Sequence, residues 1–479
     1  MTTTNSTSDK NIVAIVGAGL VGSVLALGLK KRGFDVEIFE RRADPRKNGT
    51  GGGRSINLAL SDRGMLALAA AGVTADVEAV AIAMSGRRMH AKDGASSFMA
   101  YGLNGEAIRS VSRGGLNLTL MTLCERADIP IHFEHRCDHV DLKATQIAFN
   151  TPRGDVVVDA GSIVGADGAF SAVRAAFLRT DRFDYSVSYL PHGYKEITIP
   201  ADVDGGFRFD KNALHIWPRS SFMLIALPNL DGTFTGTLFL AHDGDEPSFE
   251  SLSTPEAARA FFAEHFADAY ALMGDFDEQW ASNPVSSLST VRCGPWVRGN
   301  SFLIGDSSHA VVPFFGQGMN AGFEDCRILF ELLDEAKARG EDISVSLWPP
   351  LLERFYLARK PNADAIATLA LENFVEMRDK VGKPEFLYRK QVEAAFARAN
   401  PDVVTPAYTM VTFRPLMGYA DALSRSRAQD SVLDALCEND TVRRHLAGDA
   451  SVAEDVKALF ESAAHRLQGA SPTADTKAP

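Results

Sequence analysis

Apolar residues fall into short runs along the first forty positions of the chain. The run at 12–16 predicts a buried strand, and the glycine-rich stretch "GAGLVG" at 17–22 follows it at once. Apolar residues at helical spacing within 24–29 then predict a helix that ends near Gly33. The apolar run at 36–39 predicts a second strand, so the pattern reads strand, turn, helix, strand.

This pattern is typical of a dinucleotide-binding turn. Gly17 permits a tight turn, Gly19 lets the backbone approach a pyrophosphate, and Gly22 lets the helix pack closely on the strand. The N-terminus of the predicted helix offers free N–H groups to the phosphates. Glu40 follows the second strand, where an acidic residue can accept hydrogen bonds from an adenosine ribose. These residues predict a bound dinucleotide and leave FAD and NAD as alternatives.

Two later segments also run from a predicted strand into a glycine turn. The first, at 162–174, contains Asp167-Gly168 directly after its strand. The second ends its strand at Gly305-Asp306 and continues into a predicted helix from about Gln317. An NAD dehydrogenase needs neither segment, so the two together favour FAD.

The second segment also offers the ingredients of a hydrolase triad in Asp306, Ser307, Ser308 and His309. These residues are too close in sequence to form a hydrogen-bonded relay. A nucleophile elbow would read GxSxG, which is not the pattern here. We therefore expect residues 307–309 to be loop structure only.

The periodicity changes farther along the chain. Residues 186–289 contain several strand-like runs and predict a mostly antiparallel sheet. After Pro361, apolar residues such as Ala365 and Leu369 recur at helical spacing, and 361–465 is expected to be helical throughout.

Composition and charge narrow the class of protein. The chain of 479 residues is 46% apolar and 23% charged, as in ordinary globular proteins, and its net charge of -12 makes nucleic acid an unsuitable partner. The five cysteines are scattered, which favours a reducing cytoplasm and indicates no disulfide framework and no metal centre. The chain has no apolar stretch of ~18 residues that could span a membrane and no signal peptide. Residues 1–10 and 468–479 are expected to be disordered tails.

The three glycine-turn segments together resemble the motifs of the single-component (group A) flavoprotein aromatic hydroxylases. The resemblance implies that Asp306 contacts the ribityl chain of FAD, and that Asp167-Gly168 serves FAD and the transient passage of NADPH. The chemistry at the start of the predicted helix agrees, because the N–H groups of residues 318–320 would face the flavin N1–C2=O. A helix dipole there stabilises the anion of reduced flavin.

Further segments are similar to the kynurenine 3-monooxygenase family. They include "GGGRSINLALSDRG" at 51–64, "VPFFGQGMNAGFEDC" at 312–326, "ALENFVEM" at 370–377 and "PAYTMVTF" at 406–413, within a match from about residue 11 to about 420. The last two lie outside the generic flavin motifs, so they discriminate between hydroxylases. The resemblance implies NADPH- and O2-dependent hydroxylation of L-kynurenine to 3-hydroxykynurenine through a C4a-hydroperoxyflavin. Eukaryotic relatives carry a C-terminal membrane anchor that this chain does not show, so we expect a soluble, cytoplasmic, bacterial-type enzyme, with a homodimer left open.

The resemblance also implies roles for individual residues. Arg87 and Tyr101 are implied near the substrate carboxylate, because a guanidinium fork and a hydroxyl suit that group. The other implied substrate-binding residues are Asn373, Tyr408, Leu214, Ile225, Leu227 and Phe239, and the implied catalytic residues are Pro313, Phe314 and Gln317. The implied FAD-binding residues are Gly17, Gly19, Leu20, Val21, Gly22, Glu40, Arg41, Arg54, Leu58, Arg113, Asp167, Asp306, Gly318, Met319 and Asn320.

The expected architecture is α/β, with three parts. A discontinuous Rossmann-like FAD-binding domain is expected at 11–85, 104–185 and 290–360. An antiparallel-sheet substrate domain is expected at 186–289, and a helical C-terminal domain at 361–465.

Several alternatives stay open from the sequence. Arg88 could replace Arg87 at the carboxylate, either Phe314 or Phe315 could face the flavin, and Trp217 could be a substrate platform or a core residue. At the level of function, the alternatives are a hydroxylase of a kynurenine analogue or of another aromatic amino acid derivative, a flavoprotein halogenase or reductase, and a non-catalytic flavin-binding protein.

Overall fold

The computed structural model describes residues 12–47, 57–102, 105–244, 247–379 and 383–470. A six-stranded sheet in the order β18-β19-β12-β1-β2-β8 forms its N-terminal core, parallel except for β18. Most of its residues are buried apolar ones, because helices and a second sheet cover both of its faces. The strands are β1 (Val13–Val16), β2 (Val36–Phe39), β8 (Ile131–His132), β12 (Ser162–Gly165), β18 (Val297–Arg298) and β19 (Ser301–Leu303).

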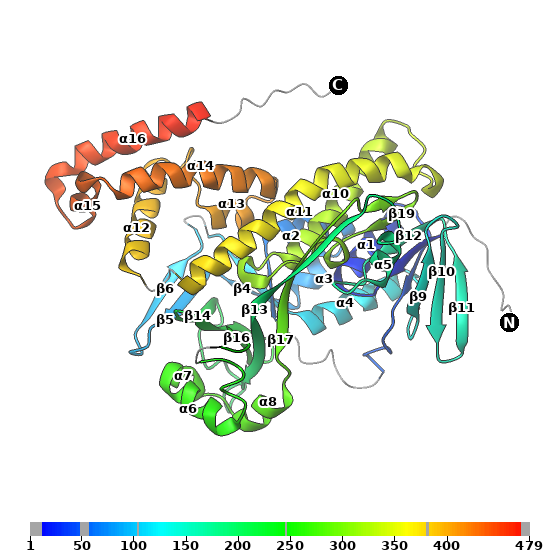
Figure 1. Cartoon of the computed structure of the whole chain (residues 1–479), viewed down its shortest axis with the longest axis horizontal. Coiled ribbons are helices and arrows are strands. Elements are labelled where there is room, and N and C mark those ends of the chain that lie inside the picture. Colours follow the sequence, from blue (N-terminus) through cyan, green and yellow to red (C-terminus); the bar gives the residue numbers. More distant parts are fainter. Residues whose placement is uncertain (1–11, 48–56, 103–104, 245–246, 380–382, 471–479) are drawn as a thin grey trace.

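Four helices pack together on one side of this sheet (Figure 1). They are α1 (Leu20–Lys31), α2 (Asp62–Ala71), α4 (Arg113–Arg126) and α10 (Gly318–Ala338). A three-stranded antiparallel sheet packs against the same core, where Phe149 stacks on Phe39 with ring centroids 4.5 Å apart. Its strands are β9 (Arg136–Asp141), β10 (Gln146–Thr151) and β11 (Gly154–Asp159), and the short helices nearby are α3 (Thr74–Glu78) and α5 (Ala172–Phe177).

A seven-stranded sheet in the order β17-β13-β16-β15-β14-β5-β6 forms the second layer of the molecule. It is antiparallel except for the β14–β5 pair, and it recruits β5 and β6 from a stretch that the sequence left unassigned. The strands are β5 (Gly86–His90), β6 (Ser96–Ala100), β13 (Asp184–Ile199), β14 (Ala213–Arg219), β15 (Phe222–Pro228), β16 (Phe234–Ala241) and β17 (Ser286–Gly294). A small sheet of β3 (Asn57–Leu60), β7 (Ile108–Ser112) and β4 (Ala81–Met84) links the two large ones.

One face of the seven-stranded sheet packs on helices that the sequence did not predict. These are α6 (Pro255–His265), α7 (Ala267–Tyr270) and α8 (Phe276–Ser282). Together with this face they enclose an aromatic core that contains Trp217, Phe234 and Phe262. Trp217 is therefore a core residue and not a substrate platform.

The helix that enters the predicted C-terminal region begins before Pro361, which the sequence did not predict. Helix α11 runs from Trp348 to Asp379 with Pro361 inside it. Proline removes one helical hydrogen bond, but the first half of α11 is held on α10 by buried ion pairs of Arg359 with Glu324 and Asp325. The helix consequently continues through the proline.

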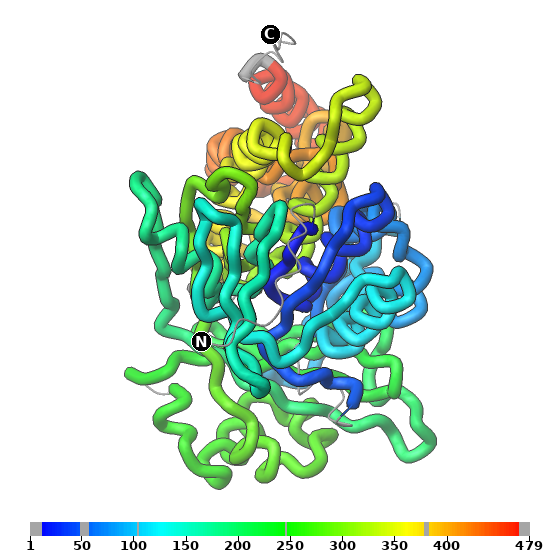
Figure 2. The backbone as a smooth tube through the Cα atoms, turned by 90° about the vertical axis from the view of Figure 1, so that its right-hand side faces the viewer, coloured from blue at the N-terminus to red at the C-terminus, as the bar shows by residue number. Residues whose placement is uncertain are grey.

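The helices that follow α11 form the C-terminal end of the molecule, opposite the α6–α8 end (Figure 2). They are α12 (Pro384–Ala399), α13 (Ala407–Phe413), α14 (Tyr419–Cys437), α15 (Asp440–Leu446) and α16 (Ala453–Ala470). All but α13 share a small apolar core of their own. Helix α16 includes residues 468–470, so these are not part of a tail, and residues 1–10 and 471–479 lie outside the described residues.

The α/β class, with an antiparallel sheet and a helical C-terminal region, is confirmed. The division into domains at the predicted boundaries stays a proposal. Among the helices of the described residues, none is both long and apolar enough to cross a membrane.

Candidate active site

The glycine-rich turn after β1 leaves an open cradle in front of α1. Gly17 has a φ of +110°, and a Cβ there would lie 2.5 Å from the Ala166 carbonyl oxygen. A Cβ on Gly22 would lie 2.1 Å from the Gly17 carbonyl oxygen, so only glycine allows this close packing. A Cβ on Gly19 would meet nothing within 4 Å, which leaves room in front of the first N–H groups of the helix. The turn therefore fits a dinucleotide pyrophosphate.

Glu40 closes one side of this cradle at the end of β2. Its Oε2 accepts a hydrogen bond from the Ala18 N–H at 3.0 Å, and its Oε1 accepts one from the Arg42 N–H at 2.9 Å. A carboxylate has about four lone-pair sites, so the contact with a ribose is compatible with these bonds and stays a prediction. Contacts to FAD also stay predictions for Leu20, Val21, Arg41, Leu58 and Arg113, whereas Arg54 lies outside the described residues.

A hydrogen bond between Asp167 and Ser307 connects the glycine turn after β12 with the glycine turn after β19. The Ser307 hydroxyl donates to Asp167 Oδ1 at 3.0 Å and accepts from the Gly168 N–H at 2.9 Å. The other oxygen, Asp167 Oδ2, accepts from the N–H groups of Ala172 and Val173 at 2.7 and 3.2 Å. Asp167 thus positions its own loop, and a direct contact with FAD stays a prediction.

The expectation that residues 307–309 are only loop structure is wrong. They belong to the short helix α9 (Asp306–His309). Ser307 is fully buried where it bonds Asp167 and Gly168. His309 Nε2 lies 2.6 Å from a buried oxygen of Asp325. These partners are 140 and 16 residues away in the sequence, so local spacing could not reveal them.

Exposed Asp306 and the start of α10 form the opposite wall of the cofactor site. The first intrahelical bond of α10 runs from the Ala321 N–H to the Gln317 carbonyl at 2.8 Å, which leaves the N–H groups of residues 318–320 available to a ligand. The Asn320 side chain is occupied, because its amide bonds Ser61, Ala59 and Gly316. Its contribution to a flavin would come from its backbone.

The pleat of β5 sends Arg87 and Arg88 to opposite faces of the seven-stranded sheet. Arg87 pairs with Leu214 of β14 and Arg88 pairs with His215. The guanidinium of Arg88 lies 3.1 Å from Asp210 on the face covered by α6–α8, and its side chain is 30% exposed. Arg87 lies half-buried on the other face, against Tyr408 and Tyr101, which favours it as the carboxylate partner.

Two tyrosine rings enclose the Arg87 guanidinium. Its central carbon lies 4.1 Å from the ring centroid of Tyr408 and 5.3 Å from that of Tyr101. Burial alone would lower the pKa of Arg87, but the two tyrosine oxygens raise it, so the side chain stays a cation. Burial raises the pKa of Tyr101, which keeps its hydroxyl protonated. Arg87 Nε and the Tyr101 hydroxyl have no hydrogen-bond partner within the described part of the chain.

An apolar wall made of two contacting clusters adjoins this polar end. Leu214 and Leu227 pack beside Tyr101, and Phe239 packs in a second cluster with Phe315 and the half-buried Phe314. Ile225 and Tyr408 contact both clusters and so join them into one wall.

Both phenylalanines of the Pro313–Phe315 turn line this wall. The ring of Phe314 lies 5.2 Å from Phe239, and the ring of Phe315 stacks 5.8 Å from Tyr408. Asn373 Nδ2 donates to the Phe314 carbonyl at 2.6 Å. Asn373 therefore holds the turn, and its contact with substrate stays a prediction.

Gln317, between this turn and α10, is only 2% exposed. Its Oε1 accepts a hydrogen bond from the Tyr419 hydroxyl at 3.0 Å. The sequence did not single out Tyr419, because nothing local connects residues 102 positions apart.

Comparison with known proteins identifies the class. A family model described as an FAD binding domain matches residues 10–342. A tetrameric 2-methyl-3-hydroxypyridine-5-carboxylic acid oxygenase has a similar fold (TM-score 0.63, 19% identity, 79% of this chain and 95% of that one). So does p-nitrophenol 4-monooxygenase from Pseudomonas putida (TM-score 0.64, 17% identity, 85% and 98%). The chain is thus an FAD-binding protein with the fold of these oxygenases.

Similarity to curated relatives narrows the class further. A kynurenine 3-monooxygenase of Christiangramia forsetii is 45% identical over 88% of this chain and 93% of its own length. Proteins of the same name from Stenotrophomonas maltophilia and Dictyostelium discoideum are 44% and 42% identical, each over 88% of this chain and over 91% and 92% of their own. The chain belongs to the kynurenine 3-monooxygenase family.

Proposed function

We propose that this chain hydroxylates L-kynurenine at ring position 3, with FAD as resident cofactor and NADPH and O2 as co-substrates. FAD, when bound, supplies the activation of O2. The observation that carries the choice of substrate is the pair of buried, unpartnered polar groups, Arg87 Nε and the Tyr101 hydroxyl. A buried polar group without a partner costs about 1–3 kcal/mol, so these two suit the carboxylate of an amino-acid ligand.

The two ends of the site then have separate tasks. Arg87 and Tyr101 bind the carboxylate, and the Asn373 side-chain oxygen accepts from the ammonium group in this proposal. The aromatic ring of the substrate lies against Phe239 and Phe314, whose apolar surfaces exclude water from the reaction. The aniline nitrogen of kynurenine already activates the ring, so the reaction requires no general base.

The test compares NADPH consumption with L-kynurenine, with kynuramine, which lacks the carboxylate, and without either compound. L-kynurenine should stimulate consumption and yield 3-hydroxykynurenine. Kynuramine should bind at least about tenfold more weakly, because it offers nothing to Arg87. The proposal is wrong if L-kynurenine yields no hydroxylated product, and the role of Arg87 is wrong if kynuramine performs equally.

Location in the cytoplasm is part of the proposal. All five cysteines are unpaired, and Cys124, Cys293 and Cys326 are buried, as suits a reducing compartment. A homodimer stays a prediction.

A further inference from the structure

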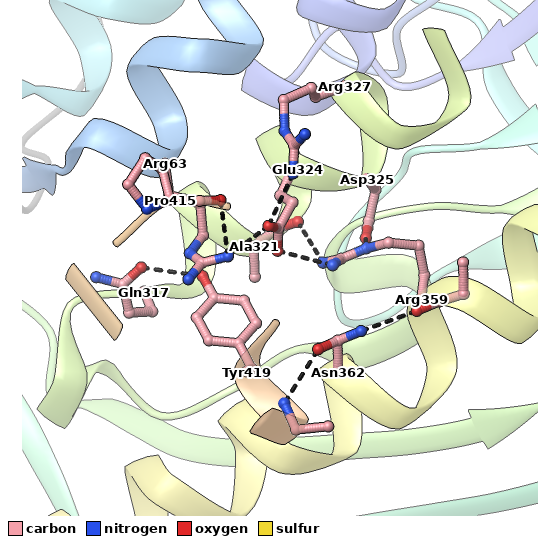
Figure 3. Close-up of polar contacts among 12 residues, drawn as sticks. Arg63, Gln317, Ala321, Glu324, Asp325, Arg327, Arg359, Asn362, Pro415 and Tyr419 are labelled. Carbon is pink, nitrogen blue, oxygen red and sulfur yellow. Dashed lines mark hydrogen bonds and ion pairs between the residues drawn. The ribbon is translucent and has the colours of Figure 1, made fainter. Parts of the chain in front are cut away.

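A buried cluster of ion pairs joins α2, α10 and α11 behind the active site (Figure 3). Arg63 of α2 and Arg359 of α11 both pair with Glu324 of α10, and Arg359 also pairs with Asp325 at 2.7 Å. None of these four side chains is more than 3% exposed. Because removal of one partner would leave a buried charge unpaired, the cluster holds the three helices in one arrangement.

Arg63 extends this cluster to the chain that enters α14. Its guanidinium donates to the carbonyl oxygens of Arg414 and Met417 at 3.3 and 2.8 Å. The same group lies 4.1 Å from the ring centroid of Tyr419, which is fully buried. A cation–π contact is strongest where water is excluded, so Arg63 determines where the Tyr419 hydroxyl points.

The Tyr419 hydroxyl points to Gln317 (Figure 3). Burial raises the pKa of Tyr419 above its usual value, so the hydroxyl stays protonated and donates to Gln317 Oε1 at 3.0 Å. An amide presents its oxygen and its nitrogen on different sides. With Oε1 held by Tyr419, Nε2 points away from Tyr419 (Figure 3), and Gln317 itself directly precedes the first N–H groups of α10.

We propose that Tyr419 is a positioning residue that fixes the orientation of the Gln317 amide, and that the C-terminal helices influence hydroxylation through this bond. The proposal deepens the proposed function and rests on it. Loss of the bond lets the amide rotate and present either atom to the cofactor site. Reduction of O2 should then end more often in the side reaction NADPH + H⁺ + O2 → NADP⁺ + H2O2, without hydroxylation.

The variant Tyr419→Phe tests this because it keeps the ring over Arg63 and removes only the hydroxyl. Tyr388→Phe is a matched control, since an Arg443 guanidinium lies 4.5 Å from the Tyr388 ring and its buried hydroxyl has no partner among the residues described. Four quantities are measured on each holoenzyme: FAD content, melting temperature, the midpoint potential of the flavin without substrate, and H2O2 formed per NADPH with L-kynurenine.

Tyr419→Phe should keep its FAD content, shift the midpoint potential, and raise H2O2 per NADPH about threefold or more, as expected for the loss of one hydrogen bond. Tyr388→Phe should match the wild type. If Tyr419 acts through Gln317, the double variant Gln317→Leu/Tyr419→Phe should behave as Gln317→Leu alone.

The two proposals fail in different ways. If Tyr419→Phe matches Tyr388→Phe in both potential and H2O2 yield, or if its effect adds to that of Gln317→Leu, the positioning role is wrong. If the potential shifts but wild-type protein gives no 3-hydroxykynurenine, the proposed function is wrong and the positioning role stands.

Discussion

The two faces of the seven-stranded sheet differ in how far their polar side chains are paired. On the face covered by α6–α8, the Trp217 indole N–H donates to Asp268 at 2.9 Å, and His90 pairs with the same carboxylate at 2.9 Å. His90 also lies 2.9 Å from the ring nitrogen of His215, whose other nitrogen contacts the Asp210 carbonyl. Folding alone completes these contacts, although Arg88 Nε on the same face is buried without a partner among the described residues.

The face toward the active site leaves polar atoms unpaired. Arg87 Nε and the Thr237 hydroxyl are buried there without a partner in the described structure. Register places both on this face, since Arg87 lies beside Leu214, and Thr237 pairs with Ile225 and through it with Ile216. Unpaired buried groups are costly in a folded protein. The comparison therefore separates a face built for stability from one built for a ligand.

The largest effect is expected from Trp217→Ala on the covered face. Loss of this fully buried ring should lower the free energy of unfolding by about 3–5 kcal/mol. Trp217→Phe, which loses mainly the bond to Asp268, should cost only about 1 kcal/mol. Denaturant unfolding of both variants measures this, and equal stability of wild type and Trp217→Ala would contradict the assignment to the core.

A pH effect should come from His215 on the same face. Burial lowers the pKa of His215 to about 4 from 6.5, with nearby His90 and Arg88 adding to the effect and Asp210 opposing it. Below pH ~6.5 the unfolded chain takes up a proton that the folded chain refuses down to pH ~4, so stability falls as the pH drops through this window. Linkage predicts a loss of about 2 kcal/mol between pH 7 and pH 5.

The measurement compares unfolding free energies at the two pH values for wild type and His215→Gln. Glutamine does not titrate, so the variant should lack this part of the pH dependence while every other group still contributes. The same loss in both proteins would show that His215 is not the group responsible.

The difference between the faces also shows what the sequence could and could not predict. The β1–turn–α1 unit was predictable because its apolar runs, its glycine turn and Glu40 all lie within residues 12–40, and each pattern depends only on residues near it in the sequence. The choice between Arg87 and Arg88 was not, because both sides of β5 are covered and the strand shows no simple alternation of buried and exposed positions. Their roles follow from what packs on each side, Tyr408 on one and Asp210 on the other.

Tertiary contacts account for other features that the sequence did not predict. A proline such as Pro361 is typical of a helix start, but the ion pairs of Arg359 with α10 stabilise the turn before it, so the helix continues through the proline. The bond from the Asn373 amide nitrogen to the carbonyl of Phe314, 59 residues away, was not predicted either, and the contact of Asn373 with substrate stays a prediction. Such roles depend on which elements meet in space, and residue type alone does not determine them.

The smallest effect is expected on the KM for L-kynurenine, from the variants Arg87→Ala and Arg88→Ala. These two variants test the comparison of the two faces most directly. Arg87→Ala should raise the KM for L-kynurenine at least about tenfold, or about 1.4 kcal/mol, because no other described cation lies between the rings of Tyr101 and Tyr408. Arg88→Ala should change KM less than about twofold, since it loses a half-exposed pair with Asp210 on the opposite face. Steady-state kinetics at saturating NADPH measure both variants. A larger effect of Arg88→Ala would mean that the carboxylate binds on the face we assign to stability, and the separation of the two faces would be wrong.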